Sequence, residues 1–145
     1  MINKIDYYII NRLQKIEMPL ARMAIFVVYF WFGLLKLLDL SPATPLIQSL
    51  FYKTINFMQF PIFYGIFSIF EIVIGVFFLL KGWERLAIFL LLLHLIMIAL
   101  PLILLPEITW QSFLVPTLEG QYIIKNILIA AIAVVIGSKL VPMKN

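Results

Sequence analysis

Four long apolar stretches, separated by short polar segments, dominate the chain. They cover about residues 20–38, 61–80, 86–105 and 122–140. Each reaches the roughly 20 residues that an α-helix needs to cross about 30 Å of hydrocarbon. None alternates apolar and polar positions as the strands of a membrane barrel do. The pattern therefore predicts an all-α membrane protein, a bundle of four transmembrane helices.

Two other segments carry apolar residues at helical spacing. Residues 1–18 do so with basic residues on other faces, which predicts an amphipathic helix lying on anionic lipid at the inner membrane surface. A cleaved signal peptide is the rival interpretation, but this leader is too long and contains acidic residues. The turn-forming residues 41–45 precede a second such segment, residues 46–58. It predicts a short helix at the outer face, either a lid over the bundle or a peripheral packing helix.

Lys and Arg positions predict the orientation, because cytoplasmic segments retain positive charge during insertion. With four spans, three basic residues fall on one side of the membrane: Lys36, Lys53 and Lys125. The other eight fall on the opposite side: Lys4, Arg12, Lys15, Arg22, Lys81, Arg85, Lys139 and Lys144. We therefore expect both termini in the cytoplasm and the first and third loops outside.

Composition agrees with a membrane environment. Of 145 residues, 64% are hydrophobic and 12% are charged, whereas soluble domains are about a quarter charged. A soluble domain would lack the polar sequence to cover so many apolar side chains. With no linker or low-complexity tract, residues 1–145 are expected to form one integral membrane domain that faces the lipid bilayer. The basic residues that give the net charge of +4 flank the spans and do not form a stripe on a soluble domain, so we expect no nucleic-acid partner.

The residue types restrict the chemistry. The chain has no cysteine and one histidine, which excludes disulfides, thiolate nucleophiles and Cys-ligated metals within it. It also lacks a zinc-helix spacing and a Gly-rich phosphate loop. We therefore expect no metal site, and the sequence leaves open whether the protein is an enzyme.

Glu71 is the most informative polar residue, because it lies near the middle of the second span. An ionised carboxylate at that depth is poorly solvated and must be paired, hydrated or protonated. Tyr64, Ser68, Glu71 and Gly75 follow one another at intervals of four, three and four residues, which places them on the same helix face. This face is expected to point into the bundle as a polar seam.

His94 lies in the third span, which follows the second through a tight loop. Antiparallel helices joined there would place His94 and Glu71 at similar depth, and whether they meet depends on helix rotation. One interpretation is a proton relay or a pair of hydrogen-bonding groups for a quinone. The other is a histidine satisfied by a carbonyl or hydroxyl group beside a protonated, packed Glu71.

Lys36 lies near the outer end of the first span, on the face that carries Tyr29 and Gly33. Its long side chain can extend outward to the interface or inward to Glu71. Asp39 is the nearer competing partner along the chain.

Lys125 and Asn126 open the fourth span and are further candidates for a polar pocket. Small residues follow them at intervals of four, three and four, at Ala130, Ala133 and Gly137. Such a face most often serves close helix packing, and a solvated rim explains the charges at the outer mouth equally well.

Three short motifs resemble the DoxX-like family of small four-span membrane proteins. They lie in residues 30–37, residues 71–87 and residues 117–126. The resemblance covers roughly residues 20–140. The positions that match the family's pattern are Gly33, Lys36, Glu71, Gly75, Gly82, Arg85 and Lys125.

The resemblance implies a four-helix bundle in the bacterial inner membrane, acting as a small subunit or accessory of a quinone-linked redox complex. It implies a membrane or periplasmic redox partner and a quinone as the ligand, while homo-oligomerisation stays open. The lack of cysteine argues against a thiol-dependent role. Two alternatives remain: a proton-coupled or small-solute transporter, and a structural or assembly partner with no chemistry of its own.

Overall fold

The computed structural model describes residues 2–55 and 57–142. Lys144, one of the basic residues expected in the cytoplasm, lies outside this described part. Four helical segments are long and apolar enough to cross a membrane, as predicted. They are α1 (Ile2–Leu37), α3 (Phe60–Leu79), α4 (Glu84–Ala99) with α5 (Pro101–Leu104), and α7 (Leu118–Ile124) with α8 (Asn126–Ser138). The chain is a multi-pass membrane protein.

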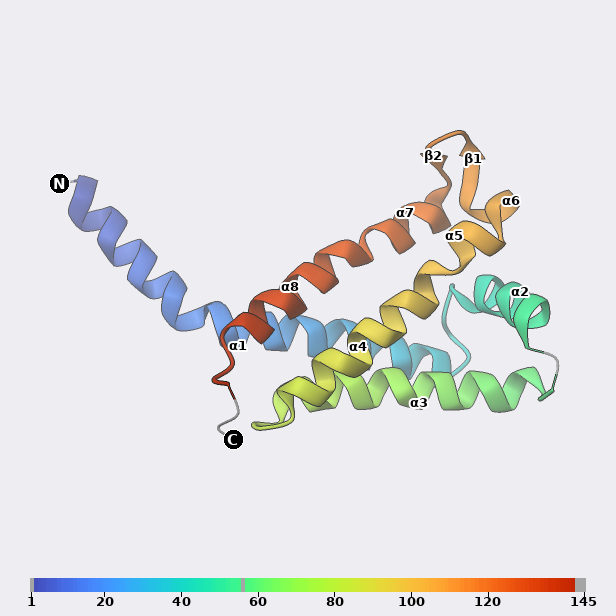
Figure 1. Cartoon of the computed structure of the whole chain (residues 1–145), viewed down its shortest axis with the longest axis horizontal. Helices are drawn as coiled ribbons and strands as arrows, with labels where there is room; N and C mark the ends of the chain where they lie inside the picture. Colours follow the sequence, from blue (N-terminus) through green and yellow to red (C-terminus); the bar gives the residue numbers. More distant parts are fainter. Residues whose placement is uncertain (1, 56, 143–145) are drawn as a thin grey trace.

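The predicted surface helix is not a separate element. α1 runs without interruption from Ile2 to Leu37, through Pro19. A proline inside a helix removes one backbone hydrogen bond and bends the axis, and Figure 1 shows the N-terminal part of α1 leaving the bundle at an angle. Its apolar side chains at Ile5, Ile9 and Leu13 are exposed. The predicted helix over residues 1–18 is thus confirmed from Ile2 on, but it continues into the span without the expected separation, and its location on the membrane surface stays a prediction.

Two of the other spans contain local breaks that hydropathy did not predict. Pro101 lacks a backbone N–H and begins α5, which separates this helix from α4 at Leu100. Lys125 separates α7 from α8. The last span starts at Leu118, four positions before the expected residue 122. Thr117 sets this start, because its side chain accepts a hydrogen bond from the backbone N–H of Gly120.

The first and third loops fold at the same end of the bundle (Figure 1). The first loop contains α2 (Thr44–Thr54), somewhat shorter than the expected helix over residues 46–58. The third contains α6 (Pro106–Thr109) and an antiparallel hairpin of β1 (Trp110–Ser112) and β2 (Val115–Pro116). The all-α prediction missed this hairpin. We call this the hairpin end, and the opposite end, where the α3–α4 turn and the end of α8 lie, the turn end.

Two glycines allow α1 and α3 to pack very closely along the bundle. A Cβ atom added at Gly75 would lie 3.0 Å from the backbone nitrogen of Phe30, and one at Gly33 would lie 2.9 Å from the carbonyl oxygen of Ser68. No larger residue fits between the two backbones, and small residues at such crossings are typical of membrane helices. This crossing places the polar faces of α1 and α3 against each other.

The half of the bundle towards the turn end has an apolar core. Its fully buried members include Ile25, Ile74, Phe78, Leu91 and Ile136. The buried ionisable side chains lie instead towards the hairpin end: Lys36 near the end of α1, Glu71 before Ile74 in α3, and His94 after Leu91 in α4. The interior therefore divides into an apolar half and a polar half.

Arg22 closes the turn end. Its Nε donates to the carbonyl oxygen of Phe78 over 2.6 Å, and its Nη1 lies 2.8 Å from Oε1 of Glu84. Oε2 of Glu84 accepts a hydrogen bond from the backbone of Gly82, which turns the chain with a φ of +90°. One guanidinium thus ties α1 to both helices that meet at this turn.

Candidate functional site: a buried ion-paired cluster

A buried ion pair joins α1 to α3. Nζ of Lys36 donates to Oε2 of Glu71 over 2.5 Å, and the two side chains are only 7% and 5% exposed. Lys36 therefore extends inward, away from the alternative partner Asp39, which is exposed. Taking both charges out of water is costly unless they meet each other with good geometry, and the glycine-lined helix crossing supplies that geometry.

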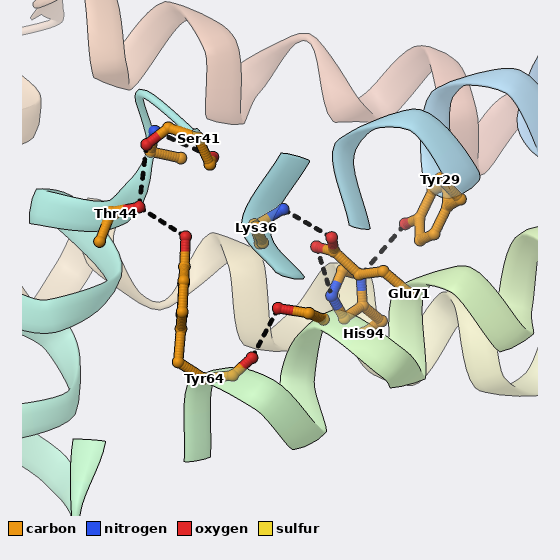
Figure 2. A network of polar contacts seen from close by, with 9 residues as sticks. Tyr29, Lys36, Ser41, Thr44, Tyr64, Glu71 and His94 are labelled. Carbon is orange, nitrogen blue, oxygen red and sulfur yellow. Dashed lines mark hydrogen bonds and ion pairs between the residues drawn. The ribbon is translucent and has the colours of Figure 1, made fainter. Parts of the chain in front are cut away.

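His94 of α4 meets the other oxygen of the same carboxylate. Its Nε2 lies 3.2 Å from Oε1 of Glu71, and its Nδ1 lies 3.2 Å from the hydroxyl of Tyr29. Figure 2 shows this chain of contacts running from Lys36 through Glu71 and His94 to Tyr29. We call these four residues the polar cluster. It links three spans at one depth.

The contact between His94 and Glu71 is close but poorly aligned. Nε2 of His94 is fully buried and, within residues 2–55 and 57–142, has no well-directed hydrogen-bond partner, because its 3.2 Å contact with Glu71 is not aligned as a hydrogen bond. Nearly all buried polar atoms are hydrogen-bonded in folded proteins. This nitrogen therefore has hydrogen-bonding capacity that the protein itself does not use well.

Phe67 covers the cluster on one side. Its ring centre lies 5.0 Å from that of His94, and Nζ of Lys36 lies 5.9 Å from the centre of the ring. The second distance permits a cation–π interaction. Phe70 contacts the His94 ring edge-on at 5.7 Å. The charged groups are thus enclosed by aromatic carbon.

A cavity of about 240 Å³ leads from the hairpin end to Lys36. Asp39 and Tyr64 contribute the other polar side chains of its lining, and we call it the polar cavity. The hydroxyl of Tyr64 lies 2.5 Å from Oγ1 of Thr44, at the start of α2 (Figure 2). This contact fastens α2 over the end of α3.

The predicted candidates on α1, α3 and α4 come together, whereas those on the last span do not. Ser68 is buried next to the cluster and donates to the carbonyl oxygen of Tyr64 over 2.6 Å. Lys125 is exposed, with its Nζ 4.9 Å above the ring centre of Tyr122, and Asn126 is half-buried. Among the described residues, neither contacts the cluster. Lys125 is one of the outer-mouth charges for which the sequence left a solvated rim open, and its exposure is compatible with that alternative.

Four of the motif residues contribute to helix packing and to the chain ends at the turn end. Gly33 and Gly75 form the α1–α3 crossing, Gly82 forms the turn between α3 and α4, and Arg85 donates to the carbonyl oxygen of Val141 beyond the end of α8. None of these four belongs to the polar cluster. They determine where the spans carrying the cluster lie.

Three residues of the site were not among the predicted candidates. Tyr29 was placed on the face of Lys36, seven positions earlier, and this spacing was the available signal for its role. Thr44 and Phe67 had no comparable signal, since a threonine after a proline-rich turn and a phenylalanine in an apolar span are ordinary. Their roles arise only from the arrangement of helices.

Among residues 2–55 and 57–142, no group of three or more His, Cys, Asp or Glu side chains lies close enough to hold a metal ion. The cluster instead combines a cation, an anion, an imidazole and a phenol. Such groups donate and accept hydrogen bonds and can carry protons. The geometry suits recognition of a polar head group or transfer of a proton.

Comparison with models of known families, with curated proteins and with solved structures finds no match for this chain. The resemblance to DoxX-like proteins therefore stays a prediction.

Proposed function

We propose that this protein is a small membrane subunit that binds the head group of a quinone and exchanges protons with it, in support of a redox complex. The observation that carries the proposal is the buried row from Lys36 through Glu71 and His94 to Tyr29. Quinone carbonyls accept hydrogen bonds, and the quinol hydroxyls donate them. A site that contains cationic, anionic and neutral groups can serve both forms.

One-sided access supports this role. The polar cavity leads to Lys36 from the hairpin end, and Asp39 and Tyr64 line it. Water in such a cavity can exchange a proton with Lys36, which lines it and donates a hydrogen bond to Glu71. We assign proton exchange with the outer solution to this cavity.

Reduction of a quinone takes up electrons and protons in equal number. The proposal assigns the protons to this chain and the electrons to a partner redox protein in or at the membrane. Glu71 is the group placed to pass a proton between Lys36 and His94, since one of its oxygens faces each. The proposal assigns orientation of the head group to His94 and Tyr29, at the other end of the cluster.

The apolar half of the interior weighs against the transporter alternative. A proton or solute path through one subunit would have to pass Ile74, Phe78 and Leu91, whose side chains fill the core with no exposure to solvent. An unhydrated apolar layer is a high barrier to ions. A binding site needs access from one side only, whereas a transport path needs access from both sides.

Quinone binding by the purified protein in lipid nanodiscs tests the proposal. The decisive variant is Glu71→Gln, with Glu119→Gln on the exposed start of α7 as the matched control. We expect Glu71→Gln to weaken binding of a benzoquinone by about tenfold, because the carboxylate that holds the donors Lys36 and His94 in place is lost, and Glu119→Gln to leave it unchanged. Equal binding by all three folded proteins contradicts the proposal.

The same preparation separates the two alternatives. A transporter predicts proton flux into proteoliposomes that Glu71→Gln abolishes, in the absence of any quinone. A structural partner predicts no quinone binding and no flux, with Glu71→Gln changing only stability or co-purification. Mass spectrometry of gently extracted wild-type protein adds the identity of retained lipids, quinones and proteins.

A further inference from the structure

A second cavity, also of about 240 Å³, lies beneath α2 and is almost wholly apolar. α2 contributes Leu50 and Phe51, α3 contributes Phe63 and Phe67, and α4 contributes Met97. The one hydroxyl in the lining belongs to Thr54, and it donates to the carbonyl oxygen of Leu50 over 2.7 Å. We call this the apolar cavity, since its lining offers a ligand only hydrocarbon and aromatic surface.

Phe67 forms a wall shared by the apolar cavity and the polar cluster. The ring lines the cavity and also lies 5.0 Å from the centre of the His94 ring. The cavity and the imidazole are therefore separated by one aromatic side chain. A ligand that extends past this ring could have a hydrocarbon part in the cavity and a polar part at His94.

His94, which lies behind Phe67 as seen from the apolar cavity, has a ring nitrogen without a well-directed hydrogen-bond partner. Nε2 is fully buried, and its contact with Glu71 is not aligned as a hydrogen bond. A carbonyl oxygen placed next to it would give this atom the partner that it lacks. This observation is independent of the cavity.

We propose that the apolar cavity holds the hydrocarbon tail of the quinone, so that the ligand is a long-tailed, membrane-embedded quinone that reaches the polar cluster past Phe67. This inference rests on the proposed function of the cluster. Apolar cavities stay dry and accept apolar guests, whereas a polar chain would lose its hydrogen bonds to water there. Since the cavity lies beside membrane-spanning helices, the guest available to it is membrane hydrocarbon.

The contacts of α2 place this helix as the cover of the tail site. Phe51 is buried and packs its ring 5.0 Å from that of Phe63 and 5.4 Å from that of Phe60. At the other end of α2, Thr44 contacts the Tyr64 hydroxyl. The helix is therefore held against α3 over the cavity, rather than lying free on the membrane surface.

The test compares two ligands with the same ring: a dimethoxy-methyl-benzoquinone without a tail, and its decyl derivative. Met97→Trp fills the apolar cavity, and Ile96→Trp, on the neighbouring but exposed position of α4, is the matched control. We measure the affinity of each protein for both ligands in the same nanodiscs, so that partitioning of the tail into lipid cancels.

We expect Met97→Trp to lower the affinity for the decyl ligand about tenfold, because the indole occupies the space that the tail would fill, without changing the affinity for the tail-less ring. Ile96→Trp should change neither. A decyl affinity unaffected by Met97→Trp, with ring binding that still depends on Glu71, overturns the tail site and leaves the proposed function standing. Failure of both ligands to bind the wild-type protein overturns the proposed function and this inference together.

A measurement on the unmodified protein guards against misfolding of Met97→Trp. A decyl quinone with a photoreactive diazirine at the end of its tail should label peptides of α2 and α4 that line the apolar cavity. Labelling confined to lipid-facing positions such as Ile96 or Ile103, both exposed, overturns the inference.

Discussion

Lys36 on α1 and Glu71 on α3 form an ion pair at 2.5 Å inside the bundle, and the pair sits where Gly33 and Gly75 bring the two helices together. A buried pair is a weak source of net stability, because desolvation offsets most of the attraction. The proposed function gives the charges at this depth a role that net stability does not.

Breaking the pair from one side should destabilise the protein more than removing it. We expect Lys36→Met to lower the free energy of unfolding by about 3–5 kcal/mol, because it leaves an uncompensated buried carboxylate. The double variant Lys36→Met/Glu71→Leu should recover most of this loss, since no unpaired charge remains. Thermal unfolding in detergent, followed by circular dichroism, measures both. Additive losses in the double variant would show that the two residues do not act as a pair.

Close packing at Gly75 should be essential for the α1–α3 crossing. An added Cβ would lie 3.0 Å from the backbone nitrogen of Phe30 and 3.2 Å from the carbonyl oxygen of Phe26. Because these neighbours are backbone atoms, we expect Gly75→Ala to cost about 1–3 kcal/mol of stability. Gly65→Ala is the control on the same helix, where a Cβ meets nothing within 4 Å; it should be neutral or stabilise by about 0.5–1 kcal/mol. Equal effects of the two substitutions in the same unfolding assay would contradict the crossing.

The spans could be predicted because the hydrocarbon thickness fixes their length. The inward face of α3 could be predicted as well, because Tyr64, Ser68 and Glu71 repeat at helical spacing. Rotation of α4 could not be predicted. This helix is apolar on all sides apart from its first residues and His94, so no amphipathic signal fixes which way the imidazole points. Only packing against Tyr29 and Phe67 determines it.

The loops were harder to predict for a local reason. The hairpin of β1 and β2 has only a few paired residues, and its turn contains Leu114 at a φ of +59°. Leucine is not among the residues that favour this conformation, so the turn lacks the Asn-Gly or Asp-Gly signal of short hairpins. At Pro19 the opposite occurs: a strong sequence signal for a break is overridden by helix on both sides.

Replacing Arg22 by lysine should lower the stability of the protein. Its guanidinium donates to the carbonyl oxygens of Phe78 and Leu80 as well as to Glu84, and a lysine ammonium cannot reproduce this planar fork. We expect Arg22→Lys to cost about 1–2 kcal/mol, because partly buried carbonyl groups lose their donors.

Arg12→Lys is the control for this substitution, since among the described residues the Arg12 guanidinium contacts only the exposed side chain of Tyr8, through its hydroxyl and its ring. It should change stability by less than about 0.5 kcal/mol. If thermal unfolding shows the same small shift for both variants, the fork at Arg22 has no structural role.

The orientation of the bundle leads to the last prediction. Lys81 and Arg85 lie at the α3–α4 turn, Arg22 contacts this turn, and Lys139 follows the end of α8, so these basic residues lie at the turn end. Lys36, Lys53 and Lys125 lie at the end of α1, in α2 and between α7 and α8, towards the hairpin end. This distribution favours a cytoplasmic turn end.

The absence of cysteine makes the chain suitable for labelling single introduced cysteines with a membrane-impermeant maleimide, because there is no background. Phe113→Cys in the exposed hairpin turn should react in right-side-out vesicles, and Lys81→Cys only in inverted vesicles. Ile69→Cys, on the lipid-facing side of α3, should stay unlabelled in both, because the maleimide reagent stays in water. The reverse labelling pattern would show that the protein has the opposite orientation. The mouth of the polar cavity would then face the cytoplasm, and the proposed proton exchange at Lys36 would be with the cell interior.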